Sequence, residues 1–300
     1  MLETLSLSGN SLTGRLVPAL GFLTSLRHLD LSQNQFYGPI LARINDLWGL
    51  EYMNLWCNNF TGRFPDGIQN LQQLKVLDFH SNGLSGDIGE LFAGIRNVEY
   101  LDLSYNMFYG TVDLDLENVS SLAKILKYLN LSHNKLSGGF FGNEIVQLFR
   151  NLQVLDLGGN LVSGELPSFG SLVNLRVLRL GSNQLYGEIP VELLGSLIPL
   201  EELDLSDNGF SGPINVINST SLSMLNLSSN ALSGSLPSTV GRCIIVDFSS
   251  NMPSGDVSAM QDWGASLEIL DLSPNKFSRS IPDLTSKFQN LTSLIMKNNS

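Results

Sequence analysis

The chain contains 300 residues, of which 43% are hydrophobic, so it has enough apolar material for a sizeable core and is not a disordered segment. Acidic residues (28) outnumber Lys and Arg (17), and the net charge of −11 repels phosphate backbones and anionic lipid heads. This balance argues against nucleic acid or a membrane surface as partner, and it suits a polar or cationic ligand.

An internal repeat begins at the first residues and continues along the whole sequence. The pattern L-x-x-L-x-L-x-x-N recurs thirteen times, and most steps between successive Asn residues are 23 to 25 residues long. A fixed period of this length is the signature of a repeat protein. The pattern ends at Asn10, Asn34, Asn58, Asn82, Asn106, Asn134, Asn160, Asn183, Asn208, Asn230, Asn251, Asn275 and Asn299.

Each copy of the pattern predicts one short strand. In Leu29-Asp30-Leu31 the apolar residues alternate with a polar one, so the leucines point inward and Asp30 points outward. One such strand has almost no core of its own, and stacked copies form a parallel sheet over a continuous interior. The Asn amide donates twice and its oxygen accepts, so we expect it to bind buried turn backbone groups of adjacent repeats.

A second signature follows each Asn. Gly lies four places after it in most repeats, and an apolar residue two places later is often followed by Pro, as in Phe64-Pro65 and Ile189-Pro190. Gly permits a tight turn, and Pro closes an extended segment that needs no N–H. This half, written LSGxIP, resembles the plant-specific class of leucine-rich repeat. The resemblance implies a second short strand and a convex side of loops and short helical turns.

The resemblance covers the whole chain and is closest to the extracellular part of plant leucine-rich-repeat receptor-like kinases. The stretches LETLSLSGNSLTGRLVP, NLQQLKVLDFHSN and SMLNLSSN are similar to members with a large ectodomain and an inactive kinase domain. This implies an α/β repeat solenoid, a curved right-handed superhelix with a concave parallel β-sheet. It also implies a receptor that binds a peptide, a small hormone or another leucine-rich-repeat ectodomain at the extracellular side of the plasma membrane.

The two ends predict an interior fragment of a longer protein. We expect residues 1–300 to be a single array of about thirteen repeats without terminal caps, because the leucines are in register from Leu2 and the chain stops one residue past Asn299. A membrane anchor would then lie in a segment outside these residues. Cys57 and Cys243 are eight strand steps apart, roughly 38 Å at ~4.8 Å per step, which is too far for a disulfide.

Motifs of catalysis are absent from the sequence. It contains no G-x-x-x-x-G-K-S/T loop, no H-R-D and no D-F-G. The three histidines, His28, His80 and His133, fall in alternate repeats, about 10 Å apart at nearest, which is too far to share a zinc ion. We therefore predict no enzyme activity, no metal site and no cofactor in this chain.

The outward side of the predicted sheet is the candidate binding surface. Its middle row is mostly Asp or Asn, and we interpret this row as a solvated structural face, with neighbours such as Ser104 exposed. Arg179 interrupts the row between Asp156 and Asp204. A ladder ion pair with these acids is expected there, and a clamp for a ligand carboxylate is the alternative.

Aromatic and imidazole side chains gather on the same side in repeats three to six. Trp56 and His80 stand where the template has Ser, and exposed Trp and Tyr are favoured anchors of binding sites. Cross-strand packing is the alternative interpretation. The predicted partner-binding residues are Tyr52, Trp56, His80, Tyr100, Tyr105, Tyr128, His133 and Arg179.

Seven N-x-S/T sequons favour an extracellular setting. Two of them, at Asn130 and Asn226, fall on the strand face, where a glycan would block a ligand. The candidates for glycosylation are Asn59, Asn118, Asn218 and Asn290.

Two other functions stay open beside the receptor kinase. One is a secreted leucine-rich-repeat inhibitor of a microbial wall-degrading enzyme, although such inhibitors are shorter and capped by cysteines. The other is a receptor-like protein without a kinase. A transcript that continues past Ser300 into a membrane helix and a kinase-like domain would separate them from the receptor kinase.

Overall fold

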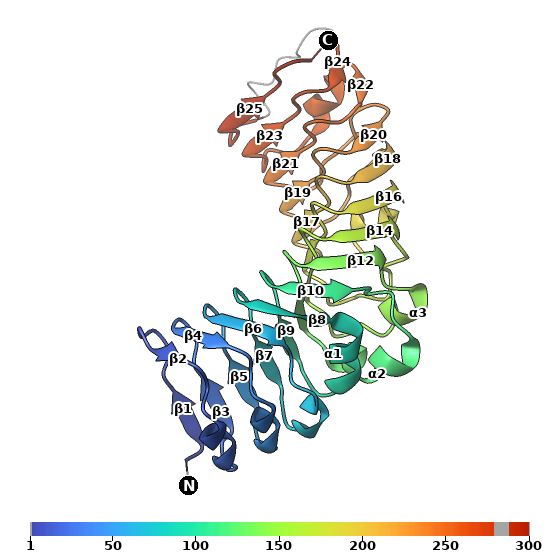
Figure 1. Cartoon of the computed structure of the whole chain (residues 1–300). Coiled ribbons are helices and arrows are strands. Elements are labelled where there is room, and N and C mark those ends of the chain that lie inside the picture. Colours follow the sequence, from blue (N-terminus) through green and yellow to red (C-terminus); the bar gives the residue numbers. More distant parts are fainter. Residues whose placement is uncertain (1, 279–287, 300) are drawn as a thin grey trace. The chain divides into compact units, whose positions relative to one another are not determined.

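The computed structural model describes residues 2–278 and 288–299, and the side chain of Asn118 lies outside the described part. The chain divides into two compact units, Met1–Leu161 and Val162–Ser300. Within each unit the successive repeats lie side by side, and each contributes short parallel strands (Figure 1). The predicted parallel repeat architecture is therefore confirmed. Among the described residues, no helix is long and apolar enough to cross a membrane.

The first unit contains two parallel sheets. The strands of the first sheet are β1 (Thr4–Ser6), β3 (His28–Asp30), β5 (Tyr52–Asn54), β7 (Val76–Asp78), β9 (Tyr100–Asp102), β11 (Tyr128–Asn130) and β13 (Val154–Asp156). Those of the second are β2 (Thr13–Gly14), β4 (Gln35–Gly38), β6 (Asn59–Arg63), β8 (Gly83–Asp87), β10 (Met107–Gly110) and β12 (Lys135–Gly139). Each strand of the second sheet is the second short strand that the LSGxIP half of a repeat implied.

Short helices follow the second strand in most repeats of this unit. They are the 3-10 turns η1 (Pro18–Phe22), η2 (Ala42–Asp46) and η3 (Ile68–Asn70), and the helices α1 (Ile88–Gly94), α2 (Leu116–Ile125) and α3 (Asn143–Val146). Asp87 is the N-cap of α1, and its carboxylate accepts a hydrogen bond from the N–H of Gly89 at 2.8 Å. Helix α1 lies against β8, β10 and α2 (Figure 1).

The second unit repeats the same plan. Its first sheet is β15 (Val177–Arg179), β17 (Glu202–Asp204), β19 (Met224–Asn226), β21 (Ile245–Asp247), β23 (Ile269–Asp271) and β25 (Ser293–Ile295). The other strands are β14 (Leu161–Glu165), β16 (Gln184–Glu188), β18 (Gly209–Pro213) and β20 (Ala231–Ser233), with the separate pair β22 (Ser254–Gly255) and β24 (Lys276–Phe277). Two 3-10 turns are η4 (Val191–Leu193) and η5 (Ser258–Asp262).

The apolar residues of the strand pattern form the core. Leu101 and Leu103 are fully buried, and Leu101 stands in register with Leu77 on one side and Leu129 on the other. Burial of each such side chain contributes about 1.5–3 kcal/mol. Because every repeat adds its leucines to those of its neighbours, the core runs continuously along each unit, as the alternating pattern predicted.

In most repeats, the Asn that ends the pattern binds backbone groups of two repeats. The side-chain amide of Asn106 donates to the carbonyl oxygens of Phe79 (2.9 Å) and Leu103 (3.1 Å), and its Oδ1 accepts the N–H of Leu84 at 2.9 Å. Phe79 and Leu84 belong to the preceding repeat, so the predicted bridging role is confirmed. The same arrangement recurs at Asn34, Asn58, Asn82, Asn134, Asn160, Asn208, Asn230 and Asn251.

The middle row of Asp and Asn is structural, as predicted, but it is not solvated at Asn54, Asp102 and Asp156, which are buried. Asp102 is only 5% exposed, and its Oδ1 accepts both the N–H (3.0 Å) and the hydroxyl (2.7 Å) of Ser104. Ser104 is itself buried, so the expectation that it is exposed is also wrong. Asp30 holds Ser32 in the same way. The carboxylate folds over the turn after the strand, because this turn leaves backbone N–H groups without strand partners.

We expect Asn106→Ala to lower the free energy of unfolding by about 2–3 kcal/mol, because it leaves buried backbone groups of two repeats without partners. The matched control is Asn70→Ala, since Asn70 is exposed on η3. The control is expected to cost less than about 0.5 kcal/mol. Denaturant titration measures both, and equal losses would contradict the bridging role of the Asn.

Candidate functional site

Eight side chains of the first unit form an aromatic face on the outward side of its first sheet. They come from the strands β3, β5, β9 and β11 and from the turns that follow the first-sheet strands. The aromatic face consists of His28, Tyr52, Trp56, His80, Tyr100, Tyr105, Tyr128 and His133.

The first row of the aromatic face lies at the first residue of successive strands. His28 stacks on Tyr52 with ring centroids 4.1 Å apart and 6° between the planes. Tyr100 stacks on Tyr128 at 4.2 Å and 10°. Val76 stands in register between Tyr52 and Tyr100 and separates the two pairs. The stacking follows from the parallel register, because equivalent residues of neighbouring strands face each other at about 4.8 Å.

The other two pairs lie just after the strands, at two different repeat positions, two residues (Trp56, His80) and one residue (Tyr105, His133) before the pattern Asn. Trp56 stacks on His80 at 4.8 Å and 12°, and Tyr105 stacks on His133 at 4.2 Å and 22°. Tyr105 and His133 both have positive φ angles (53° and 52°), which turns their side chains outward, and Tyr105 is 56% exposed. The next repeat has Gly159, where a Cβ would come within 2.7 Å of His133 Nδ1. Glycine at this position therefore leaves room for the His133 ring.

Hydrogen bonds hold three of the rings, those of Tyr52, His80 and Tyr128. His80 Nδ1 and Asp78 Oδ1 are 2.7 Å apart. Asp102 Oδ2 accepts the Tyr128 hydroxyl at 3.3 Å and the Asn130 amide at 3.1 Å. Another contact lies within β5, where the Asn54 amide donates to the Tyr52 hydroxyl at 3.0 Å. The polar middle row thus orients the aromatic rings on both sides of it.

This network changes the acidity of its members. The hydrogen bond to Asp78, with the charges of Asp78 and Asp102, raises the pKa of His80 in spite of its partial burial. Burial raises the pKa of Tyr100 and of Tyr128, and the nearby charge of Asp102 raises both further. The two phenols therefore stay protonated near neutral pH and act as hydrogen-bond donors.

Among the described residues, one group of three side chains has the donor types that hold a metal. The nearest donor atoms of Asp78, His80 and Asp102 lie within 4.8 Å of one another. However, His80 already contacts Asp78, and both oxygens of Asp102 accept hydrogen bonds. The arrangement works as a closed hydrogen-bonded network, and we assign no metal to it.

The basic residues beside the aromatic face are paired. In the row before the strands, Glu51 lies 2.9 Å from Arg27 and 3.6 Å from Lys75, and Lys127 lies 2.5 Å from Glu99. These contacts are between exposed groups and add little to stability. Their consequence is electrostatic, because the paired cations do not neutralise the carboxylates of the middle row. The face is therefore acidic as well as aromatic.

The structure brings seven of the eight predicted partner-binding residues together on this face, and Arg179 lies in the second unit. Arg179 forms the expected ladder ion pair, but with Glu202 of the neighbouring strand, through two contacts of 2.6 and 2.7 Å. The sequence had suggested Asp156 and Asp204 as partners, and it gave no sign of Glu202. Glu202 is two residues before the middle-row Asp204, and its long side chain reaches the guanidinium with both carboxylate oxygens.

Sequence reasoning missed several members of the site. His28 was treated only as a possible zinc ligand, although it occupies the same repeat position as Tyr52, one period earlier. Asp78 and Asp102 were assigned to a solvated row, and their contacts to His80 and Tyr128 depend on side-chain directions that a pattern does not show. The repeat alignment was the available signal, and it identifies His28 but not the hydrogen bonds.

The sequons differ in how their Asn side chains are used. Asn59 and Asn218 are exposed. Asn290 is exposed too, but its amide nitrogen donates to the carbonyl oxygen of Ala265 at 2.8 Å, so the fold uses the atom that would carry a glycan. The Asn130 amide donates to Asp102, which agrees with its omission from the candidates. Asn118 lies outside the described side chains.

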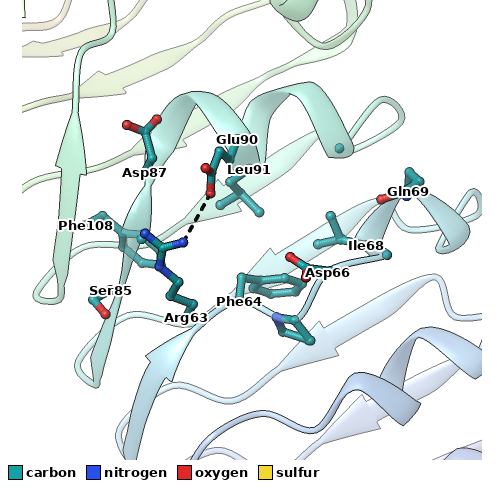
Figure 2. Close-up of a pocket in the computed structure, with 14 residues that line it drawn as sticks. Arg63, Phe64, Asp66, Ile68, Gln69, Ser85, Asp87, Glu90, Leu91 and Phe108 are labelled. Carbon is teal, nitrogen blue, oxygen red and sulfur yellow. Dashed lines mark ion pairs between the residues drawn. The ribbon is translucent and has the colours of Figure 1, made fainter.

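A cavity of about 260 Å³ lies away from this face, between the segment after β6 and helix α1 (Figure 2). Phe64 and Leu91 provide apolar walls, and Arg63 stands at its rim, 4.0 Å from Glu90. The Arg63 guanidinium also donates to the hydroxyl of Tyr109 at 2.6 Å. Since the only cation that lines the cavity already has these partners, we favour the aromatic face as the site.

The repeat pattern, the stacked parallel strands and the Asn bridges define a class of protein. Leucine-rich-repeat families match most of the chain, and the chain belongs to the leucine-rich-repeat family. The matches are to Leucine rich repeat (49–108), Leucine Rich repeats in two copies (150–194) and Leucine Rich Repeat (1–23, 25–47, 126–146, 199–219, 221–243 and 266–288).

Its relatives and structural neighbours include plant receptors. The chain is 57% identical over 162 residues to a probable inactive receptor kinase of Arabidopsis thaliana, which covers 54% of this chain and 16% of the relative. It is 32% identical over 208 residues to Receptor-like protein 54 of the same species, which covers 62% and 26%. The Arabidopsis receptor kinase HAESA, solved with the peptide hormone IDA and the co-receptor SERK1, matches with a TM-score of 0.80 and 27% identity, covering 100% of this chain and 54% of HAESA. The chain thus spans about half or less of each.

We expect Asp78→Asn to lower the pKa of His80, because it removes the carboxylate that stabilises the imidazolium. A raised pKa in the folded state gives stability that is fully present below the unfolded pKa, ~6.5, and is lost as pH rises through the folded pKa. The variant should lose this acid-side stability. Imidazole NMR titration measures the shift, with Asp30→Asn as control at the same repeat position. A His80 titration unaltered by Asp78→Asn would contradict the network.

Proposed function

We propose that this chain is the ligand- or partner-binding extracellular region of a plant receptor-like protein kinase with an inactive kinase domain, acting in cell-surface signalling. The aromatic face carries this proposal. A leucine-rich repeat needs only small or polar residues on its outward strand positions, yet repeats two to six carry eight aromatic or imidazole rings there. Similarity to an inactive receptor kinase and to the HAESA ectodomain supports the receptor assignment.

The aromatic face has the physical properties of a preorganised binding surface. Large rings bury much area in a complex, and hot spots of interfaces are enriched in Trp and Tyr. Here each ring is stacked on a neighbour, and several are hydrogen-bonded, so little side-chain entropy is lost when a partner binds. Trp56 is the proposed central anchor, because it is half-buried beside His80 and close to the acidic middle row.

The proposed partner is a peptide, a small hormone or another leucine-rich-repeat ectodomain. HAESA was solved with a peptide hormone and a co-receptor, which supports partners of these kinds. The acidic middle row adds a preference for polar or cationic groups, since the cations beside it are already paired. We assign binding, and not catalysis, to this chain, and we place it at the extracellular side of the plasma membrane as part of a longer protein.

A second candidate is a receptor-like protein without a kinase. The 32% identity to Receptor-like protein 54 over 208 residues favours it, because the repeat region alone does not distinguish the two receptor types. The aromatic face would have the same binding role in both. Sequencing of the transcript downstream of Ser300 separates them, since only the receptor kinase continues into a kinase-like domain.

We expect Trp56→Ala to weaken partner binding by at least ~2 kcal/mol, which is the scale of an interface hot spot. The probes are synthetic peptides selected by phage display on the wild-type chain, and isothermal calorimetry measures their affinity. The stability cost should stay below about 1.5 kcal/mol, because the main loss is one ring stack.

The matched control is Trp48→Ala. Trp48 follows η2, away from the strand face, and is 64% exposed. This variant should bind the selected peptides as the wild type does. If the peptides bind Trp56→Ala with wild-type affinity, the binding surface lies elsewhere on the chain.

A further inference from the structure

A groove of about 660 Å³ in the second unit has apolar walls that are open to solvent. It runs between η4 with the segment after it and the segment after β18. Leu194 and Ile214 form its floor, and Val191, Leu197 and Val216 stand at its edges with exposed fractions of 82%, 78% and 45%. Exposed aliphatic side chains gathered in one groove favour association between molecules unless something covers them.

A glycosylation sequon lies in the wall of this groove. Asn218 is one of the residues that line the groove, and it begins the sequon Asn218-Ser219-Thr220. The N–H groups of Asn218 and Ser219 both donate to the carbonyl oxygen of Leu194, at 3.1 and 3.0 Å, so the backbone of the sequon is held against the groove. Asn218 and Thr220 are exposed and Ser219 is buried, which leaves the two residues that a transferase reads on the surface.

The amide of Asn218 contrasts with those of other sequons. The Asn290 amide donates to a backbone carbonyl of the preceding repeat, and the Asn130 amide donates to Asp102. A glycan at either position would break a contact that the fold makes. Asn59 is exposed on β6 in the first unit and serves as a reference sequon without the groove.

We propose that Asn218 carries an N-linked glycan whose first sugars lie over the groove and cover Val191, Leu197 and Val216. The co-reactant is a lipid-diphosphate-linked oligosaccharide, used by a separate transferase. The Asn218 amide nitrogen loses a proton and forms a bond to the anomeric carbon, while the bond from that carbon to the diphosphate oxygen breaks and the lipid diphosphate leaves. The C–H faces of pyranose rings then contact the aliphatic edges, and the hydroxyl groups face water. This inference rests on the proposed extracellular setting.

The test uses the whole chain secreted from eukaryotic cells through an added leader. Mass spectrometry of glycopeptides measures occupancy at Asn218, with Asn59 as the internal reference. Asn218→Gln and Thr220→Ala remove the same sequon from its two ends. Both should raise the fluorescence of an apolar-surface dye such as anilinonaphthalene sulfonate about twofold, because the groove becomes accessible. The control Asn59→Gln should leave the dye signal unchanged.

A rescue variant ties the effect to the groove. Val191→Thr with Leu197→Thr, added to Asn218→Gln, should return the dye signal to the wild-type level, since both side chains are exposed and tolerate the change. An unmodified Asn218, or a dye signal that does not respond to Asn218→Gln, overturns the proposal. Neither result touches the proposed function, because Trp56-dependent peptide binding is measured separately on the first unit.

Discussion

The bridging hydrogen bonds of the pattern Asn are the interaction on which the rest of the structure depends. Asn106 and most of its counterparts join the backbone of their own strand turn to the repeat before it, at buried or half-buried positions. One repeat buries too little surface to be stable alone, so every neighbour must be held at the same distance and register. With that spacing set, residues at equivalent positions of successive strands face each other, and the aromatic pairs follow.

The aromatic face shows how a proposed binding surface is added to such a scaffold without disturbing its core. The leucines and the Asn are used inside, which leaves the outward strand positions free to vary. Tyr128 stacks on Tyr100 and binds Asp102, yet Leu129 beside it keeps its place in the core. Asp102 serves both purposes, because one of its oxygens closes the turn through Ser104 and the other orients the ring. The proposed binding surface and the fold therefore share a few residues and are otherwise separable.

The repeat was predictable from the sequence because its signals are local and recur thirteen times. Strand positions, inward leucines and the Asn bridge all follow from period and hydrogen-bonding capacity. The site was predictable only in outline, since Trp56 and His80 stood out as departures from the template. The burial of Asp102 and Ser104 and the contact between Arg179 and Glu202 depend on rotamers and side-chain length. These are properties of neighbouring strands taken together, and the pattern of one strand does not contain them.

The spacing between strands also determines which residues of a peptide lying across them would meet successive repeats. Each step along the first sheet is ~4.8 Å, whereas an extended peptide advances ~3.3 Å per residue. Two strand steps, about 9.6 Å, therefore match three peptide residues, about 9.9 Å. An extended peptide laid across the strands would therefore advance three residues for every two repeats, and residues three apart point to opposite faces of that peptide. Tyr52 and Tyr100 are two repeats apart, with Val76 between them, so they are separated by one such two-strand step.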